Sequence, residues 1–145
     1  MSLTIRKMKQ DDFDELYALL SDPNTMKYLE EPYSKAKAKR FLVEAGLSAT
    51  PLIYAVEFKN HFIGYIIYHS YDANSIEIGW VISPEYRGKG VASKLTEQLI
   101  ETKDTKKDLV IECVPEQLVT KHIAQKYGFV FEKNENGLDI YRLKR

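Results

Sequence analysis

The spacing of apolar residues changes several times along the chain, and each change marks the boundary of an expected element. A short alternating strand over residues 3–6 opens the chain, and two segments with apolar residues at helical spacing follow it. The pair Asp11 and Asp12 offers an N-cap for the first helix, and Ser34 offers one for the second. Gly46 ends the second helix. This part of the chain therefore predicts one strand and two helices.

Three strands are expected next. Residues 52–58, 62–69 and 75–82 are rich in Ile, Val and Tyr, and only the short turns 59–61 and 72–74 separate them. Parallel strands need a long crossover between them. Because these connections are short, the pattern predicts an antiparallel meander.

The last third of the chain alternates between helix and strand. A helix follows Gly90, and the apolar run 109–114 predicts a strand that is buried on both faces. A helix over 118–127 and a hairpin of 128–131 with 138–142, closed by Asn136-Gly137, complete the pattern. The order β-α-α-β-β-β-α-β-α-β-β indicates one α/β (α+β) domain over residues 1–145, with about four helices and a mixed, mostly antiparallel sheet of six to seven strands.

Composition excludes several classes of protein. Hydrophobic residues make up 44% of the chain, and 21 basic residues balance 21 acidic ones. A balanced charge provides no general field for nucleic acid or for an anionic membrane, so neither partner is expected. The N-terminus lacks the apolar core of a signal peptide, and Cys113 is the single cysteine. A cytoplasmic protein without disulfides is therefore expected.

The segment Arg87-Gly88-Lys89-Gly90-Val91-Ala92 lies between the third meander strand and a helix. Glycines allow close approach of the backbone to an anion, and a helix N-terminus favours negative charge. The P-loop pattern is absent, and a dinucleotide-binding G-x-G-x-x-G is only nearly met because Ser93 replaces the third glycine. The pattern [Q/R]-x-x-G-x-[G/A] is filled. The alternative to an anion site is a basic turn before an ordinary helix.

With this loop in its context, the chain resembles the GNAT superfamily of N-acetyltransferases. The resemblance covers nearly the whole chain, from the opening Leu-Thr-Ile-Arg strand to a helix that closes on Lys-Tyr-Gly-Phe. The segments Asp-Pro-Asn-Thr-Met-Lys-Tyr-Leu and Glu-Ile-Gly-Trp-Val-Ile-Ser-Pro-Glu-Tyr-Arg-Gly-Lys-Gly are most similar to the branch that contains ribosomal-protein N-terminal acetyltransferases.

The resemblance implies that the loop binds the pyrophosphate of acetyl-CoA, the cosubstrate. It also implies that the preceding strand splays from its neighbour, so that free backbone groups pair with the pantetheine arm. Gln117 stands where relatives often have an Asn that contacts the cofactor. The implied cofactor-binding residues are Trp80, Val81, Ile82, Arg87, Gly88, Lys89, Gly90, Val91, Ala92, Ser93 and Gln117.

The reaction implied is direct attack of an amine on a thioester, which needs a base but no metal. Glu77 and Glu112 are the two candidates, since both match catalytic acids of relatives. The alternatives are a solvated position for Glu77 and an ion pair with Lys or Arg for Glu112. Many relatives place a Tyr general acid where this chain has Ala124, so the donor to the thiolate is left open.

The acceptor is expected to be a primary amine, either a protein N-terminus or a small molecule. The loop 24–34 faces its entry path, where Glu30 and Glu31 would attract an ammonium group and Tyr28 and Tyr33 would wall the path. An exposed acidic turn is the alternative. A non-catalytic acetyl-CoA sensor, a nicotinamide-dependent oxidoreductase and assembly as a homodimer are also left open.

Overall fold

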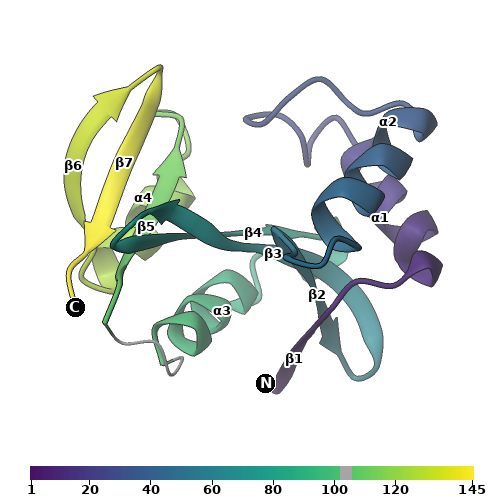
Figure 1. The fold of residues 1–145 in the computed structure, drawn as a ribbon, viewed down its shortest axis with the longest axis horizontal. Helices are drawn as coiled ribbons and strands as arrows, with labels where there is room; N and C mark the ends of the chain where they lie inside the picture. Colours follow the sequence, from purple (N-terminus) through teal and green to yellow (C-terminus); the bar gives the residue numbers. More distant parts are fainter. Residues whose placement is uncertain (102–105) are drawn as a thin grey trace.

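The computed structural model describes residues 1–101 and 106–145, and its elements follow the predicted order (Figure 1). The strands are β1 (Leu3–Arg6), β2 (Ile53–Phe58), β3 (His61–Asp72), β4 (Ser75–Ile82), β5 (Asp108–Cys113), β6 (Val130–Glu135) and β7 (Leu138–Leu143). The helices are α1 (Phe13–Leu20), α2 (Lys35–Phe41), α3 (Val91–Ile100) and α4 (Leu118–Lys126).

The strands form one mixed sheet of seven strands in the order β1-β2-β3-β4-β5-β7-β6. Neighbours run antiparallel except β4 and β5, which pair in parallel. The predicted mixed, mostly antiparallel sheet with four helices is confirmed. Within the described residues, no helix combines the length and the apolar character that crossing a bilayer requires.

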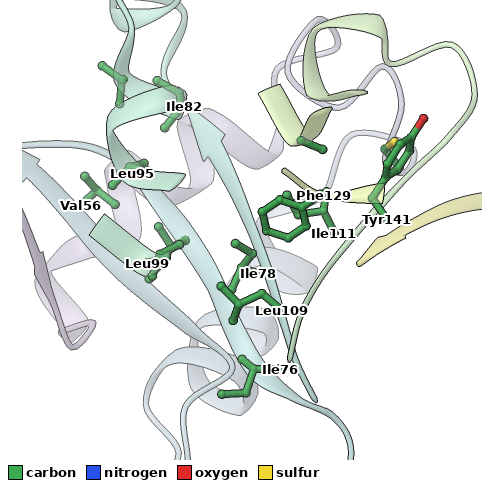
Figure 2. Packing of buried hydrophobic residues seen from close by; sticks show 14 of the residues in the cluster. Val56, Ile76, Ile78, Ile82, Leu95, Leu99, Leu109, Ile111, Phe129 and Tyr141 are labelled. Atoms are coloured by element: carbon green, nitrogen blue, oxygen red, sulfur yellow. The ribbon is translucent and has the colours of Figure 1, made fainter. Parts of the chain in front are cut away.

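Two apolar clusters cover the two faces of the sheet. On one face, Leu95 and Leu99 of α3 pack with Ile78 of β4 in a cluster named here the α3 cluster (Figure 2). On the other face, α1 and α2 supply a second cluster that includes Leu16 and Ala38. Figure 1 accordingly shows α1 and α2 on one side of the sheet and α3 on the other. Because successive strand residues point to opposite faces, the burial of Ile78 against α3 turns its neighbours in the chain toward the other face.

The predicted caps have different outcomes. Ser34 caps α2, because its Oγ accepts the N–H of Lys37 at 3.2 Å. Asp12 occupies the N-cap position of α1, as predicted, but its side chain makes no capping hydrogen bond to that helix. Residues 10–12 form a 3-10 turn, and the Asp12 carboxylate accepts the N–H of Lys9 at 2.7 Å and two hydrogen bonds from Arg6. The second helix also changes character before its predicted end, since residues 42–46 widen into a π-helical turn.

The hairpins show one confirmed turn and one unpredicted irregularity. Asn136 and Gly137 both have positive φ angles, 54° and 82°, as the predicted turn between β6 and β7 requires. The β3 strand is longer than the sequence pattern indicates, and a bulge between Ser70 and Asp72 shifts its register with β4. This shift decides which β3 side chain faces Glu77.

Candidate functional site

A cleft of about 740 Å³ opens where β4 ends and where α3 and α4 begin. Its lining includes Trp80, Val81, Ile82, Arg87, Gly88, Gly90, Val91, Ala92, Ser93 and Gln117. The structure thus brings together the residues that the sequence assigns to the cofactor, apart from Lys89. The Lys89 ammonium group lies outside this lining, 5.6 Å from the ring centre of Tyr86.

The glycine loop leaves open space at the N-terminus of α3. Gly88 and Gly90 have φ angles of 70° and 82°, and a Cβ added at either position would meet no atom within 4 Å. The first helical hydrogen bond of α3 runs from the N–H of Lys94 to the carbonyl oxygen of Gly90, at 3.0 Å. The preceding N–H groups, of residues 91–93, therefore have no acceptor within the helix. Together they form a cradle suited to an anion.

Arg87 is turned partly toward the protein. Its Nε donates to the carbonyl oxygen of Ile82 at 3.0 Å, and its Nη2 donates to the hydroxyl of Thr25. Thr25 in turn donates from its N–H and its hydroxyl to Asp22, at 2.9 and 2.6 Å. Arg87 therefore connects the glycine loop to the loop after α1, an arrangement that the sequence pattern did not indicate.

The strand before the glycine loop diverges from one of its neighbours. β4 pairs with β3 up to Ile82, but its parallel pairing with β5 ends at Glu77 and Val110. Residues 78–82 thus have no β5 partner among the described residues, so this edge of β4 is left without a neighbouring strand, and at its far end the Ile82 carbonyl oxygen accepts from Arg87. The splay that the resemblance implied is present, and Glu77 is the last paired residue before it.

Gln117 is fixed at the N-terminus of α4. Its Oε1 accepts the N–H of Val114 at 2.9 Å, so the carboxamide spans the end of β5 and the start of α4. The next two residues, Leu118 and Val119, line the cleft and are 71% and 74% exposed. The lining of the cleft therefore includes an exposed apolar stretch at the start of α4.

The two candidate bases lie on the sheet face that points away from α3. Glu77 lies between Ile76 and Ile78 in sequence and Glu112 between Ile111 and Cys113, and all four apolar neighbours belong to the α3 cluster. The Glu77 side chain is only 20% exposed. Burial and the nearby charge of Glu112 raise the pKa of Glu77, and the charge of His69 opposes this shift. The solvated alternative for Glu77 does not hold.

Glu112 is half-buried on β5. Among the described residues, no Lys or Arg forms an ion pair with it, so the alternative of a charge-paired Glu112 is not met. Its charge acts on Tyr71: burial and Glu112 raise the pKa of the Tyr71 hydroxyl to about 12. Glu77 and Glu112 thus form a sheltered pair of carboxylates.

A second cavity, of about 510 Å³, lies between the loop after α1 and the end of β5. Its lining comprises Pro23, Met26, Lys27, Tyr28, Leu29, Glu30, Glu31, Pro32, Val114 and Glu116. Tyr28, Leu29 and Glu116 also line the first cleft, so the two spaces adjoin. The structure places Tyr28, Glu30 and Glu31 on this cavity, while their role toward an acceptor stays a prediction.

Tyr33 and Glu30 have structural partners as well. Tyr33 is buried in the α1/α2 cluster rather than on the cavity wall, and its hydroxyl donates to Glu30 at 2.6 Å. Burial and this bond raise the pKa of Tyr33 to about 12. Glu30 also pairs with Lys37 at 3.0 Å. Glu31 has no such ion pair among the described residues, which leaves it the freer of the two acids.

The position at which many relatives have a tyrosine holds no hydroxyl here. Ala124 is fully buried in the α3 cluster, and Tyr127 is half-buried and packs against that cluster. Neither residue lines the cleft.

This arrangement of a glycine cradle, a free strand edge and sheltered carboxylates agrees with comparisons of the whole chain. The sequence model of one protein family, the acetyltransferase (GNAT) domain, matches residues 2–130. The chain belongs to the GNAT acetyltransferase family. It is therefore an enzyme of acetyl transfer to amines, as the sequence predicted, whereas its branch within the family stays a prediction.

Relatives of this GNAT acetyltransferase cover most of its length. The uncharacterized N-acetyltransferase YnaD of Bacillus subtilis (strain 168) is 30% identical over 132 residues, which are 87% of this chain and 78% of that protein. A GNAT-family acetyltransferase from Bacillus anthracis shares the fold with a TM-score of 0.85 at 24% identity, over 99% of this chain and 95% of the other.

A spermidine N-acetyltransferase from Vibrio cholerae, solved in complex with CoA and spermine, shares the fold with a TM-score of 0.77 at 24% identity. The match covers 97% of this chain and 92% of the other.

Three residues of this acetyltransferase site were not found from the sequence. Thr25 belongs to the Asp-Pro-Asn-Thr-Met-Lys-Tyr-Leu segment but was given no role there, and Glu116 sits in a loop without a motif; only the folded chain brings them to the cleft. His69 was assigned no specific role, yet it lies opposite Glu77. The sequence could indicate such a contact only through a count of residues outward from the hairpin turn. The β3 bulge shifts the register by one residue, so this count gives the wrong partner.

Proposed function

We propose that this acetyltransferase binds acetyl-CoA in the 740 Å³ cleft and transfers the acetyl group to a primary amine that enters through the second cavity. One observation carries the proposal: the free edge of β4 and the glycine cradle open into the same cleft. The residues 1–145 act as one catalytic domain in this proposal.

The residues present fit CoA. The free N–H groups of residues 91–93 suit its pyrophosphate, and the open space at Gly88 and Gly90 lets that group approach the backbone. The free β4 edge at residues 78–82 suits the amide groups of the pantetheine arm, which can add to the sheet as a strand would. Acetyl-CoA supplies a thioester whose carbonyl carbon the amine attacks while CoA leaves as a thiol.

Glu77 is the base in this proposal. An acceptor amine enters as an ammonium ion and attacks only after it has lost a proton. Glu77 stands where the free edge begins, and its raised pKa suits a group that accepts a proton near neutral pH. Glu112 supports it by adding negative charge nearby. With Ala124 in place of a tyrosine, the departing thiolate takes its proton from solvent.

Calorimetric titration and a thiol-release assay together test this function. Acetyl-CoA and CoA are titrated into the protein, and CoA release is then measured with a panel of amines, which includes N-terminal peptides of ribosomal proteins and spermine. We expect both ligands to bind and at least one amine to support turnover. Failure of CoA to bind, or binding without release for every amine, would contradict the proposal.

The acceptor cavity is proposed to favour a cationic amine. Glu31 and Glu116 are exposed carboxylates on its wall, while Glu30 is shared with Lys37. Glu31→Gln should therefore raise the KM of the acceptor by about threefold and leave the KM of acetyl-CoA unchanged. A threefold change corresponds to the roughly 0.7 kcal/mol that one exposed charge pair contributes. Equal acceptor kinetics in the variant and the parent would remove Glu31 from the site.

Glu30→Gln serves as the comparison variant. Residue 30 lies on the same cavity, but this change also removes the ion pair with Lys37 and the negative charge that strengthens the hydrogen bond from Tyr33, so it should lower stability as well as acceptor affinity. A denaturation curve of each variant separates the two effects.

A further inference from the structure

Glu77 faces a histidine across the β3–β4 ladder. The register sets His69 directly opposite Glu77, and His69 Nε2 lies 3.9 Å from Glu77 Oε1. Directly opposed residues of an antiparallel pair point to the same face of the sheet. The His69 side chain is 29% exposed, so the contact is sheltered but not sealed from solvent.

The ring of His69 is held in one orientation. Its Nδ1 lies 2.9 Å from the carbonyl oxygen of Ser70. A carbonyl oxygen can only accept, so Nδ1 carries a proton and donates it in this contact. In the neutral ring, Nε2 is then the unprotonated nitrogen, and it is the nitrogen that faces Glu77. A proton that the ring takes up is therefore added at the atom next to the carboxylate.

Negative charge dominates the surroundings of this pair. Glu112 of β5 is the other charged group that acts on Glu77. Further out, Tyr71 lies beside Glu112 and is also affected by Glu132 and Glu135, and Arg142 of β7 faces Glu132. Arg142 is held by Asp108 at 3.2 Å and by Glu132 at 2.9 Å, so its charge is already balanced. Within the described part of the chain, His69 is the group placed to supply positive charge directly to Glu77.

We propose that His69 is a positioning residue for Glu77, whose imidazolium form holds Glu77 as the carboxylate that accepts the proton of the acceptor. This assignment rests on the proposed function, in which Glu77 is the base. In the step itself, an N–H bond of the ammonium ion breaks and an O–H bond forms on Glu77. The proton then passes to water, and Glu77 returns to its ionised form beside His69.

The variant His69→Asn tests the assignment. An asparagine amide can still donate to the Ser70 carbonyl, but it cannot become a cation beside Glu77. A unit charge at about 4 Å shifts a carboxyl group by about one pH unit in water-like surroundings. The acid limb of the kcat/KM profile for the acceptor should therefore move to higher pH by about one unit. At low pH, the variant's kcat/KM should then fall about ten times further below that of the parent than it does on the high-pH plateau.

Two comparison variants sharpen this result. His69→Arg supplies a permanent cation and should return the acid limb toward its parental position, whereas a residue needed only for folding would not be rescued by charge. His61→Asn changes an exposed histidine of the same strand and should leave the profile in place. Parallel losses of activity at all pH values in His69→Asn would overturn the assignment.

A second measurement does not depend on turnover. The titration midpoint of the Glu77 carboxyl carbon, followed by NMR, should rise by about one pH unit in His69→Asn. An unchanged midpoint would overturn the assignment even in an active enzyme. If the parent fails to bind acetyl-CoA or to acetylate any amine, the proposed function fails, while the NMR titration still decides whether His69 acts on Glu77.

Discussion

Replacing Gly90 with aspartate tests whether the glycine loop serves a ligand rather than the fold. Gly90 has a φ of 82°, lines the cleft, and has no atom within 4 Å of the place a Cβ would take. Gly137 provides a matched control, because it has the same φ of 82° and the same open space but lies in the turn between β6 and β7. The two substitutions differ mainly in their surroundings, because Gly90 faces the cleft and Gly137 does not.

The expected magnitudes follow from this match. A left-handed backbone disfavours a non-glycine residue by about 1–2 kcal/mol, so both variants should lose a similar free energy of unfolding. At about 5 Å from a pyrophosphate with about two negative charges, the new carboxylate of Gly90→Asp is repelled by roughly 2 kcal/mol in water-like surroundings. Because each 1.4 kcal/mol is about tenfold, CoA affinity should fall by more than about tenfold in this variant.

Urea denaturation and calorimetric titration with CoA measure the two quantities on the same protein samples. Gly137→Asp should show the loss of stability without the loss of affinity. If Gly90→Asp binds CoA like the parent, or if Gly137→Asp weakens CoA equally, the loop is not the anion cradle and the reasoning from its geometry is refuted.

Two further predictions concern the contacts around the site. Thr25→Val removes the hydroxyl that joins Arg87 to Asp22 and should raise the acceptor KM severalfold, since each lost hydrogen bond contributes about 1 kcal/mol; unchanged steady-state kinetics would refute the connection. Burial opposes ionisation of Asp12, but hydrogen bonds from Arg6 and from the backbone outweigh it and lower the pKa of Asp12. This stabilisation is complete above the unfolded value of about 4 and is lost as the pH falls through the lower folded value. Asp12→Asn should thus be about 2 kcal/mol less stable in urea at neutral pH and should lose less stability on acidification than the parent does.

The glycine loop could be predicted from the sequence because its determinants are local. A strand end, glycines with positive φ and a helix start lie within a few residues of one another, and each has a residue signature. The closing turn at Asn136-Gly137 is local in the same sense. The inward position of Arg87 is different, since its hydroxyl partner on Thr25 is 62 residues away in the chain.

The His69–Glu77 contact shows why sheet registers are harder to predict. The β3–β4 turn pairs Asp72 with Ser75. An unbroken ladder from that pair would set Ser70 opposite Glu77. The bulge moves the register by one residue, so His69 takes that place, and a shift of one residue exchanges the two faces of the strand. The sequence pattern identified both strands correctly but carries no signal for the extra residue.

The length of β4 links the two ends of the proposed site. Glu77 is the last residue paired with β5, and no described β5 residue pairs with β4 from there to Ile82, a span of roughly 17 Å for an extended strand. The glycine cradle follows beyond that end. A base at one end of a free strand edge and an anion cradle at the other demand a donor long enough to reach both, with groups between them that can pair with a backbone. A short acetyl donor would fill the cradle and leave its acetyl group far from Glu77, so the spacing itself favours a thioester on a long, amide-bearing arm.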